Sequence, residues 1–154
     1  SQVTGFSKLS GLINDMFDTM YEEEGIGLAA NQVGVDMNLF VIDISHTDDD
    51  EFPRIFINGE VTSASGESVF SEGCLSIPDT FIEIERPKIC EVEYVDINGK
   101  IKTQEFDGLL STCVQHEINH LDGKLIIEHL SKLKKDMIIK KLVKHKKELN
   151  KIVL

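Results

Sequence analysis

The fold class is decided by residues 88–123, KICEVEYVDINGKIKTQEFDGLLSTCVQHEINHLDG. Within this stretch the hydrophobic residues change from the alternating spacing of a strand to the spacing of a helix. Apolar and polar residues alternate on both sides of Asn98-Gly99, a favoured two-residue hairpin turn, so this part predicts two paired strands. From Gly108 to His120 the pattern predicts a helix, and Gly123 follows as its expected C-terminal stop. The stretch therefore predicts an antiparallel hairpin that leads directly into a helix.

Further strands are expected before this hairpin, and helices are expected at both ends of the chain. Apolar residues at helical spacing predict a helix over residues 8–21, and a lysine-rich amphipathic pattern predicts a long final helix from Leu130 to Ile152. The stretch EEEGIGLAANQVG, residues 22–34, is expected to be a loop because two close glycines break the helical pattern. Short apolar or alternating runs predict strands at residues 38–44, 54–58 and 80–87.

This order of elements, with strands in the middle and helices at the ends, predicts an α+β fold. We expect mostly antiparallel sheets packed around the helix that carries the histidines, with the amphipathic basic helix, residues 130–153, at the C-terminus. The chain has 154 residues, of which 41% are hydrophobic and 28% charged, an ordinary balance for a globular protein. One domain spanning residues 1–154 is therefore expected.

The sequence also indicates the cellular compartment. No apolar run reaches the roughly 18–20 residues of a membrane span, and the first residues lack the basic-then-apolar pattern of a signal peptide. The three cysteines, Cys74, Cys90 and Cys113, form an odd count without the spacing of a disulfide framework. We therefore expect a reduced, cytoplasmic protein with no membrane partner, in which any special cysteine is a ligand or a nucleophile.

The charge is spread unevenly along the chain. The net charge is −11, but the segment from His129 to Leu154 holds nine lysines against Asp136 and Glu148, so that residues 1–128 carry −18. An acidic main body argues against DNA as a partner. The basic tail is a separate feature, which suits weak contact with phosphate backbones.

The strongest chemical signal is QHEINH, residues 115–120. His116 and His120 lie four residues apart, so that a helix places both imidazoles on one face, with Glu117 beside them. This His-Glu-x-x-His pattern is typical of a metal site with a built-in base, although two satisfied core histidines would give the same spacing. A catalytic site usually takes a third protein ligand and keeps one position open.

The third ligand is not decided by spacing. The protease pattern that continues with His-x-x-Gly-x-x-His fails, because Ile126 stands at the required histidine position. Glu128 lies beyond the Gly123 stop and is a weak candidate. Cys113 precedes His116 on the same helix, but a rise of about 10.5 Å separates it from His120, so we expect it to line a pocket beside the metal.

Cys74 is the other open candidate. It lies in SEGCLSIP, where a glycine-flanked turn would bring its sulfur and the next backbone N–H to one point. The alternative is a small buried hydrophobe, a common fate of a free cysteine. The residues alone leave these two interpretations of Cys74 evenly matched.

Three segments together resemble a known family. GIGLAANQ (residues 25–32), EGCLS (72–76) and QHEINH (115–120) resemble, in order and separation, the signature motifs of bacterial-type peptide deformylases. These enzymes remove the formyl group from the N-terminal formylmethionine of new polypeptides. The resemblance implies one divalent ion per chain, with Fe²⁺ expected and Zn²⁺, Ni²⁺ or Co²⁺ able to substitute.

The resemblance also implies a role for individual residues. Cys74, His116 and His120 would hold the metal, and Glu117 would transfer protons. The Gln32 side-chain amide and the Leu75 backbone N–H would donate hydrogen bonds to the oxyanion. The substrate-binding residues implied are Gly25, Ile26, Gly27, Gly73, Leu109 and Cys113, of which the apolar ones would surround the methionine side chain.

The sequence departs from the family pattern at three places. Asn119 stands where the family usually has aspartate, and we expect a looser contact to Arg86 as a result. The arginine that often follows EGCLSIP is absent from the following residues, DTFIE. The segment before the first helix is shorter than the family usually has.

Two other functions fit parts of the pattern. Another metal-dependent peptidase or amidase would use the same ligands, and an inactive metal-binding module would bind the ion without turnover. Glu117 and Gln32 argue against the module, because a structural site needs neither a base nor an oxyanion donor. The expected partners are formyl-Met nascent peptides, with the ribosome as a further partner through the basic C-terminal helix.

Overall fold

The computed structural model describes residues 9–47, 50–74 and 77–123, without the side chains of residues 74 and 77–80. The expected long helix from Leu130 to Ile152 lies outside these residues. The described elements are, in chain order, α1 (Ser10–Glu22), β1 (Gly27–Ala29), the 3₁₀ turn η1 (Ala30–Val33), β2 (Leu39–Ile42), β3 (Arg54–Ser65), β4 (Ser68–Cys74), β5 (Ile77–Arg86), β6 (Ile89–Val95), β7 (Ile101–Asp107) and α2 (Gly108–Leu121).

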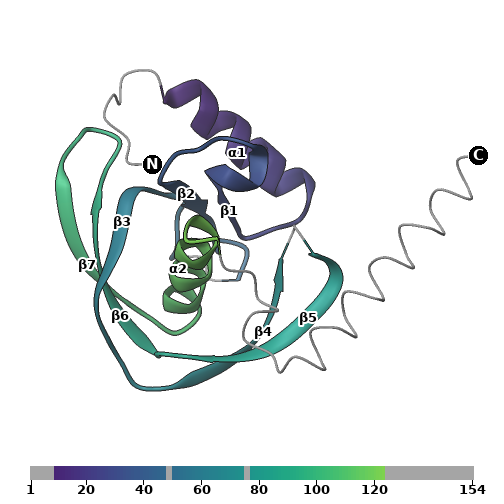
Figure 1. The fold of residues 1–154 in the computed structure, drawn as a ribbon, viewed down its shortest axis with the longest axis vertical. Helices are drawn as coiled ribbons and strands as arrows, with labels where there is room; N and C mark the ends of the chain where they lie inside the picture. The colour runs from purple at the N-terminus through teal and green to yellow at the C-terminus, as the bar shows by residue number, and fades with distance from the viewer. Residues whose placement is uncertain (1–8, 48–49, 75–76, 124–154) are drawn as a thin grey trace, which may run out of the picture.

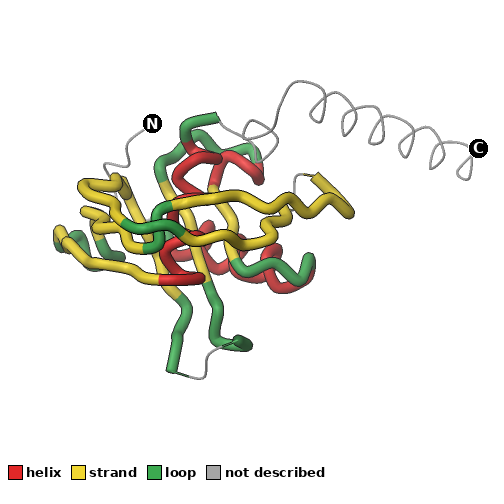
Figure 2. Tube along the Cα trace, turned by 90° about the horizontal axis from the view of Figure 1, so that it is seen from below, coloured by secondary structure: helices red, strands yellow, loops and turns green. Residues whose placement is uncertain are grey.

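The strands form two antiparallel sheets around α2. A five-stranded sheet has the order β1-β2-β3-β6-β7, and β4 and β5 form a separate two-stranded sheet. Figure 1 shows α2 near the centre, with the strands around it and α1 beside β1 and β2. Figures 1 and 2 both place the β4–β5 hairpin on the right of the molecule, opposite the β6–β7 hairpin. The expected α+β fold with antiparallel sheets around the histidine helix is confirmed.

Strand β2 separates two hydrophobic clusters, which explains its uninterrupted apolar sequence. Phe40 and Ile42 belong to the cluster that includes Val114 of α2, whereas Leu39 and Val41 belong to the cluster that includes Met16 of α1. Because side chains alternate between the two faces of a strand, all four residues of β2 are buried. The five-stranded sheet is thus covered by α1 on one face and by α2 on the other.

Several predicted boundaries differ from the structure. The first helix spans Ser10–Glu22 rather than residues 8–21, and the strand expected at 54–58 continues to Ser65. The stretch 22–34, expected as a loop, contains β1 and η1. Strand β1 was not predicted because it has three residues, too few for a periodic pattern. Strand β4 was also missed, since its buried face carries the charged Glu72, which hides the alternation.

The predicted β6–β7 hairpin is confirmed, but its turn is of a different kind. A two-residue type I′ turn needs positive φ at both Asn98 and Gly99, and of these two only Gly99 has it, at 81°. The carbonyl of Asp96 accepts the N–H of Gly99 at 3.0 Å. The Asp96 carboxylate accepts the N–H groups of Asn98 and Lys100 at 2.9 and 3.0 Å. The side chain of Asp96 therefore stabilises a longer, three-residue connection.

The left-handed backbone at Gly99 makes a stability prediction. Gly99→Ala should destabilise the protein by about 1 kcal/mol, because a Cβ disfavours positive φ. Gly11→Ala is the matched control: this glycine lies in helix α1, and an added Cβ would meet nothing within 4 Å. It should leave stability unchanged or raise it by up to about 1 kcal/mol. Urea unfolding measures both changes, and a Gly99→Ala variant as stable as the parent would contradict the turn.

Candidate active site

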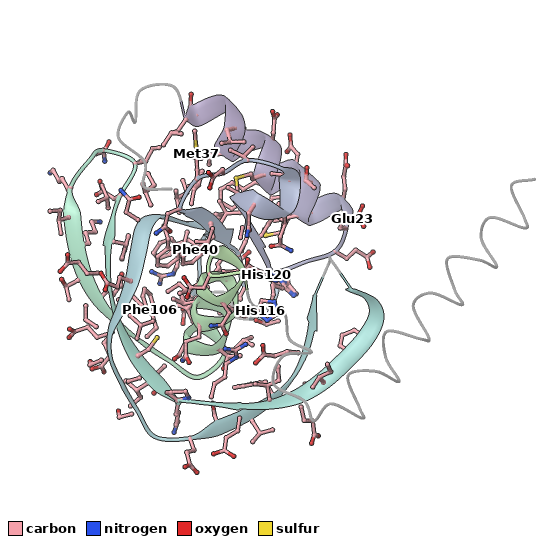
Figure 3. The ribbon with its side chains drawn as sticks, in the orientation of Figure 1. Glu23, Met37, Phe40, Phe106, His116 and His120 are labelled. Carbon is pink, nitrogen blue, oxygen red and sulfur yellow. The ribbon has the colours of Figure 1, made fainter. Side chains whose placement is uncertain are left out.

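Helix α2 brings the two predicted histidines together. His116 and His120 lie one helical turn apart, and their Nε2 atoms are 3.0 Å from each other. Figure 3 shows both imidazoles on the side of α2 that faces the β4–β5 hairpin. The possible ligand atoms of His116, Glu117 and His120 all lie within 4.8 Å of one another, and all three residues are buried. Such a set of imidazole and carboxylate groups suits a divalent metal ion.

Glu72 of β4 holds the first histidine in a defined state. Its Oε1 lies 2.7 Å from His116 Nδ1, and both side chains are buried. A carboxylate accepts hydrogen bonds, so this contact places the imidazole proton on Nδ1. The lone pair of His116 is then on Nε2, the nitrogen that faces His120. This is the arrangement in which a carboxylate orients a metal-binding histidine.

Arg86 of β5 extends this contact into a buried network. Its Nε donates to Glu72 Oε2 at 2.7 Å and its Nη2 donates to Glu72 Oε1 at 3.0 Å. Burial alone would raise the pKa of Glu72, but hydrogen bonds from His116 and Arg86 outweigh it and hold the pKa below its ordinary value. Glu72 is therefore an ionised acceptor at neutral pH.

Asn119 completes the network on the helix side. Arg86 Nη1 donates to Asn119 Oδ1 at 2.7 Å. The expectation of a looser contact to Arg86 is therefore wrong. The physical reason is that an amide oxygen, like a carboxylate oxygen, accepts a hydrogen bond from a guanidinium N–H.

Strand β1 passes close to Glu117 because it lacks a side chain at Gly27. A Cβ placed on Gly27 would lie 2.8 Å from Glu117 Oε1, which is too close for real atoms. The glycine of the GIGLAANQ segment therefore leaves room for this carboxylate between β1 and α2.

The turn η1 fixes the predicted oxyanion donor. The backbone N–H of Ala29 donates to Gln32 Oε1 at 2.8 Å, which identifies the oxygen end of this amide. Its NH₂ group is consequently at the other end of the amide. Asn31, next to Gln32, donates from Nδ2 to the backbone oxygen of His120 at 2.5 Å. This bond ties the turn to the helix that carries the histidines.

Three predicted pocket residues belong to one apolar cluster. Cys113 is buried in it, and Ile26 and Leu109 pack against it. Burial, followed by the nearby carboxylates of Glu117 and Glu72, raises the pKa of Cys113 to about 12. Cys113 stays our expected pocket residue, because its side chain is buried in this apolar cluster.

The cysteine loop is described only in part. The backbone of Cys74 ends β4, two residues after Glu72, but its side chain and Leu75 lie outside what the structure describes. Gly73 is exposed at the end of the same strand. Gly25 donates its N–H to the carbonyl of Met20 at 2.9 Å, which holds the start of the GIGLAANQ segment against α1.

Two contributors to this site were given no role by the sequence. Glu72 was quoted within EGCLS, but nothing in a single sequence shows that its partner is His116, 44 residues later. The same holds for Asn31, whose partner His120 is 89 residues away. The sequence signal that could have identified both residues is their position in the EGCLS and GIGLAANQ motifs, beside predicted functional residues.

Among the described residues, no helix is long and apolar enough to cross a membrane.

Comparisons with known proteins identify the same family that the sequence motifs resemble. Residues 1–136 match the family model described as polypeptide deformylase. The chain is 56% identical over 136 residues to the peptide deformylase of Pelagibacter ubique, covering 88% of this chain and 79% of that protein. It is 50% identical over 141 residues to that of Mesorhizobium japonicum, covering 91% and 80%.

Solved structures agree. A peptide deformylase from Legionella pneumophila superimposes with a TM-score of 0.88 at 43% identity, covering 97% of this chain and 88% of that one. The Synechococcus elongatus enzyme, solved in complex with actinonin, gives a TM-score of 0.84 at 39% identity, covering 92% and 78%. With the paired histidines, the adjacent glutamate and the glycine-lined strand all in place, this chain belongs to the polypeptide deformylase family.

Proposed function

We propose that this metal-dependent deformylase holds one divalent ion with Cys74, His116 and His120 and uses Glu117 as its proton carrier. The observation that carries the proposal is the 3.0 Å separation of the two histidine Nε2 atoms in a buried site. The bond between Glu72 and His116 supports it, because it keeps the Nδ1 proton away from the metal side. The backbone of Cys74 follows that of Glu72 by two residues at the end of β4.

The reaction is the hydrolysis of the formyl amide of a formyl-Met peptide. A bound divalent ion lowers the pKa of a water molecule and polarises a carbonyl oxygen. Glu117 accepts the proton of the attacking water and later delivers a proton to the leaving amine. The Gln32 amide and the Leu75 backbone N–H donate to the oxyanion, and one such donor is commonly worth about 3–4 kcal/mol. The Ala29–Gln32 bond supports this orientation of the amide.

The peptide is expected to lie between β1 and β4. Among the described strands, β1 pairs with β2 alone and β4 with β5 alone, so each has an edge that an extended peptide can join. Gly25, Gly27 and Gly73 let the backbones approach closely. The methionine side chain would then enter the cluster that contains Cys113, against Ile26 and Leu109.

The identity of the ion is part of the proposal. Fe²⁺ is the expected native ion, although Zn²⁺ binds more tightly to most sites of this kind and would replace it during purification. Formylated nascent peptides are made in the cytoplasm. The cytoplasm therefore remains our prediction for the compartment of this protein.

The ligand assignment predicts different results for the two cysteines. Cys74→Ala should lose deformylase activity and most of the bound metal, because it removes a thiolate ligand. Cys113→Ala is the matched control and should keep the ion, since we expect this buried side chain to line the pocket rather than to bind the metal. Metal content per chain and formate release measure both effects. A Cys113→Ala variant without metal, beside a Cys74→Ala variant with it, would reverse the assignment.

The role of Glu117 predicts a slow but intact variant. Glu117→Gln should bind metal and substrate but release formate about 10²- to 10⁴-fold more slowly, the usual contribution of general acid–base catalysis. Glu105→Gln makes the same chemical change at an exposed position on β7 and should not alter the rate. The assay measures anaerobic formate release from a formyl-Met peptide. Cleavage of the unformylated peptide is measured separately as the test for a peptidase. Activity of Glu117→Gln within threefold of the parent would exclude this role.

The basic tail suggests contact with the ribosome, where formylated substrates appear. Residues 129–154 hold nine lysines against two acids and are strongly positive, whereas residues 1–128 are acidic. Replacing Lys134, Lys141, Lys144 and Lys147 by Glu should abolish co-sedimentation with ribosomes at low salt, whereas the same four changes to Arg should preserve it. Turnover of a short formyl-Met peptide should be unchanged in both. Equal co-sedimentation of the parent and the four-Glu variant would rule out this contact.

A further inference from the structure

The β4–β5 hairpin has one face toward α2 and one face toward solvent. On the face toward α2, Glu72 bonds to His116 and Arg86 bonds to Asn119. The opposite face is here called the outer face. Among the strand residues whose side chains are described, the exposed ones on this face are Val69, Ser71, Gly73, Phe81, Glu83 and Glu85. Phe81 is 73% exposed, an unusual position for a large aromatic side chain.

The ring of Phe81 lies directly on Gly73. These two residues are cross-strand partners, and a Cβ placed on Gly73 would lie 2.7 Å from Phe81 Cε1. Gly73 therefore leaves the space that the ring occupies. Gly73 directly precedes Cys74, so the ring covers the outer face of β4 one residue before the cysteine of the proposed metal site.

The alternation of side chains decides which substrate residue meets this ring. Leu109 and Cys113, which the proposed methionine pocket uses, belong to α2. A peptide that joins the β4 edge at Gly73 and points its methionine side chain toward α2 must point its next side chain to the outer face. That second side chain arrives where the Phe81 ring is exposed.

We propose that Phe81 is a specificity-determining residue, which favours apolar and aromatic side chains at the position after methionine. This inference rests on the peptide path proposed above. An exposed aromatic ring gains by covering its apolar surface and by stacking with another ring. Glu83 and Glu85, on the same face, add negative charge that disfavours Asp or Glu at that substrate position.

The experiment compares two substrates, formyl-Met-Phe-Ser and formyl-Met-Ala-Ser, with the iron- or nickel-loaded enzyme. The parent should show a higher kcat/KM for the phenylalanine peptide. In Phe81→Ser the ratio of the two kcat/KM values should fall about three- to tenfold, mainly through KM, because a stacking contact is lost. Phe81→Leu should give an intermediate ratio, since it keeps an apolar side chain.

Val69→Ser is the matched control. Val69 is 57% exposed on the same outer face but lies four residues before Gly73, so its loss should not change the ratio. A ratio that Phe81→Ser and Phe81→Leu both leave unchanged, in enzymes that still release formate, would overturn the proposal. Failure of the parent to release formate from either peptide would instead count against the proposed function itself.

Discussion

The hydrogen bond between Glu72 and His116 is the contact on which this site depends. It joins the two-stranded sheet β4–β5 to helix α2, and it does so between buried groups 2.7 Å apart. Removing one partner from a buried charged contact commonly costs about 3–5 kcal/mol, because the other charge is left uncompensated. Arg86 reinforces the contact by binding both oxygens of Glu72. The same network that positions the hairpin therefore also fixes the imidazole tautomer that the proposed metal site requires.

Asn119 joins this network with a neutral side chain. Its amide oxygen still accepts from Arg86 at 2.7 Å, so the geometry of the network is kept. What changes is the charge: Glu72 is the one carboxylate that the described residues place on Arg86. The guanidinium is thus matched by a single negative charge, which keeps its bidentate hold on Glu72 free of a competing carboxylate.

The sequence predicted the parts of the fold that rest on long periodic patterns. The β6–β7 hairpin and helix α2 followed from alternation and helical spacing, and their bounds agree within a residue or two. Strand β1 could not be predicted because three residues are too few to show a periodic pattern. Strand β4 could not be predicted because the buried Glu72 interrupts its alternation of apolar and polar residues. The turn at Asn98-Gly99 was assigned to the wrong type because the Asp96 side chain, rather than the dipeptide, determines it.

The site was predictable where it is local and unpredictable where it depends on the fold. The spacing of His116 and His120 is a property of one helix, so the sequence was sufficient. The contacts of Glu72 and Asn31 to that helix join residues 44 and 89 positions apart, and only the folded chain brings them together. The choice between Cys74 and Cys113 has the same origin, because it depends on which sulfur the folded chain brings to the two histidines.

X-ray absorption spectroscopy of the zinc-loaded protein tests the central claim most directly, because it reports the atoms bound to the ion. The account predicts one sulfur at about 2.3 Å and two imidazole nitrogens at about 2.0–2.1 Å, with an oxygen in the remaining position. The sulfur signal should vanish in Cys74→Ser and persist in Cys113→Ser. A parent spectrum without sulfur, with Glu117 supplying the third protein ligand, would contradict the assignment of Cys74 and of Glu117 alike.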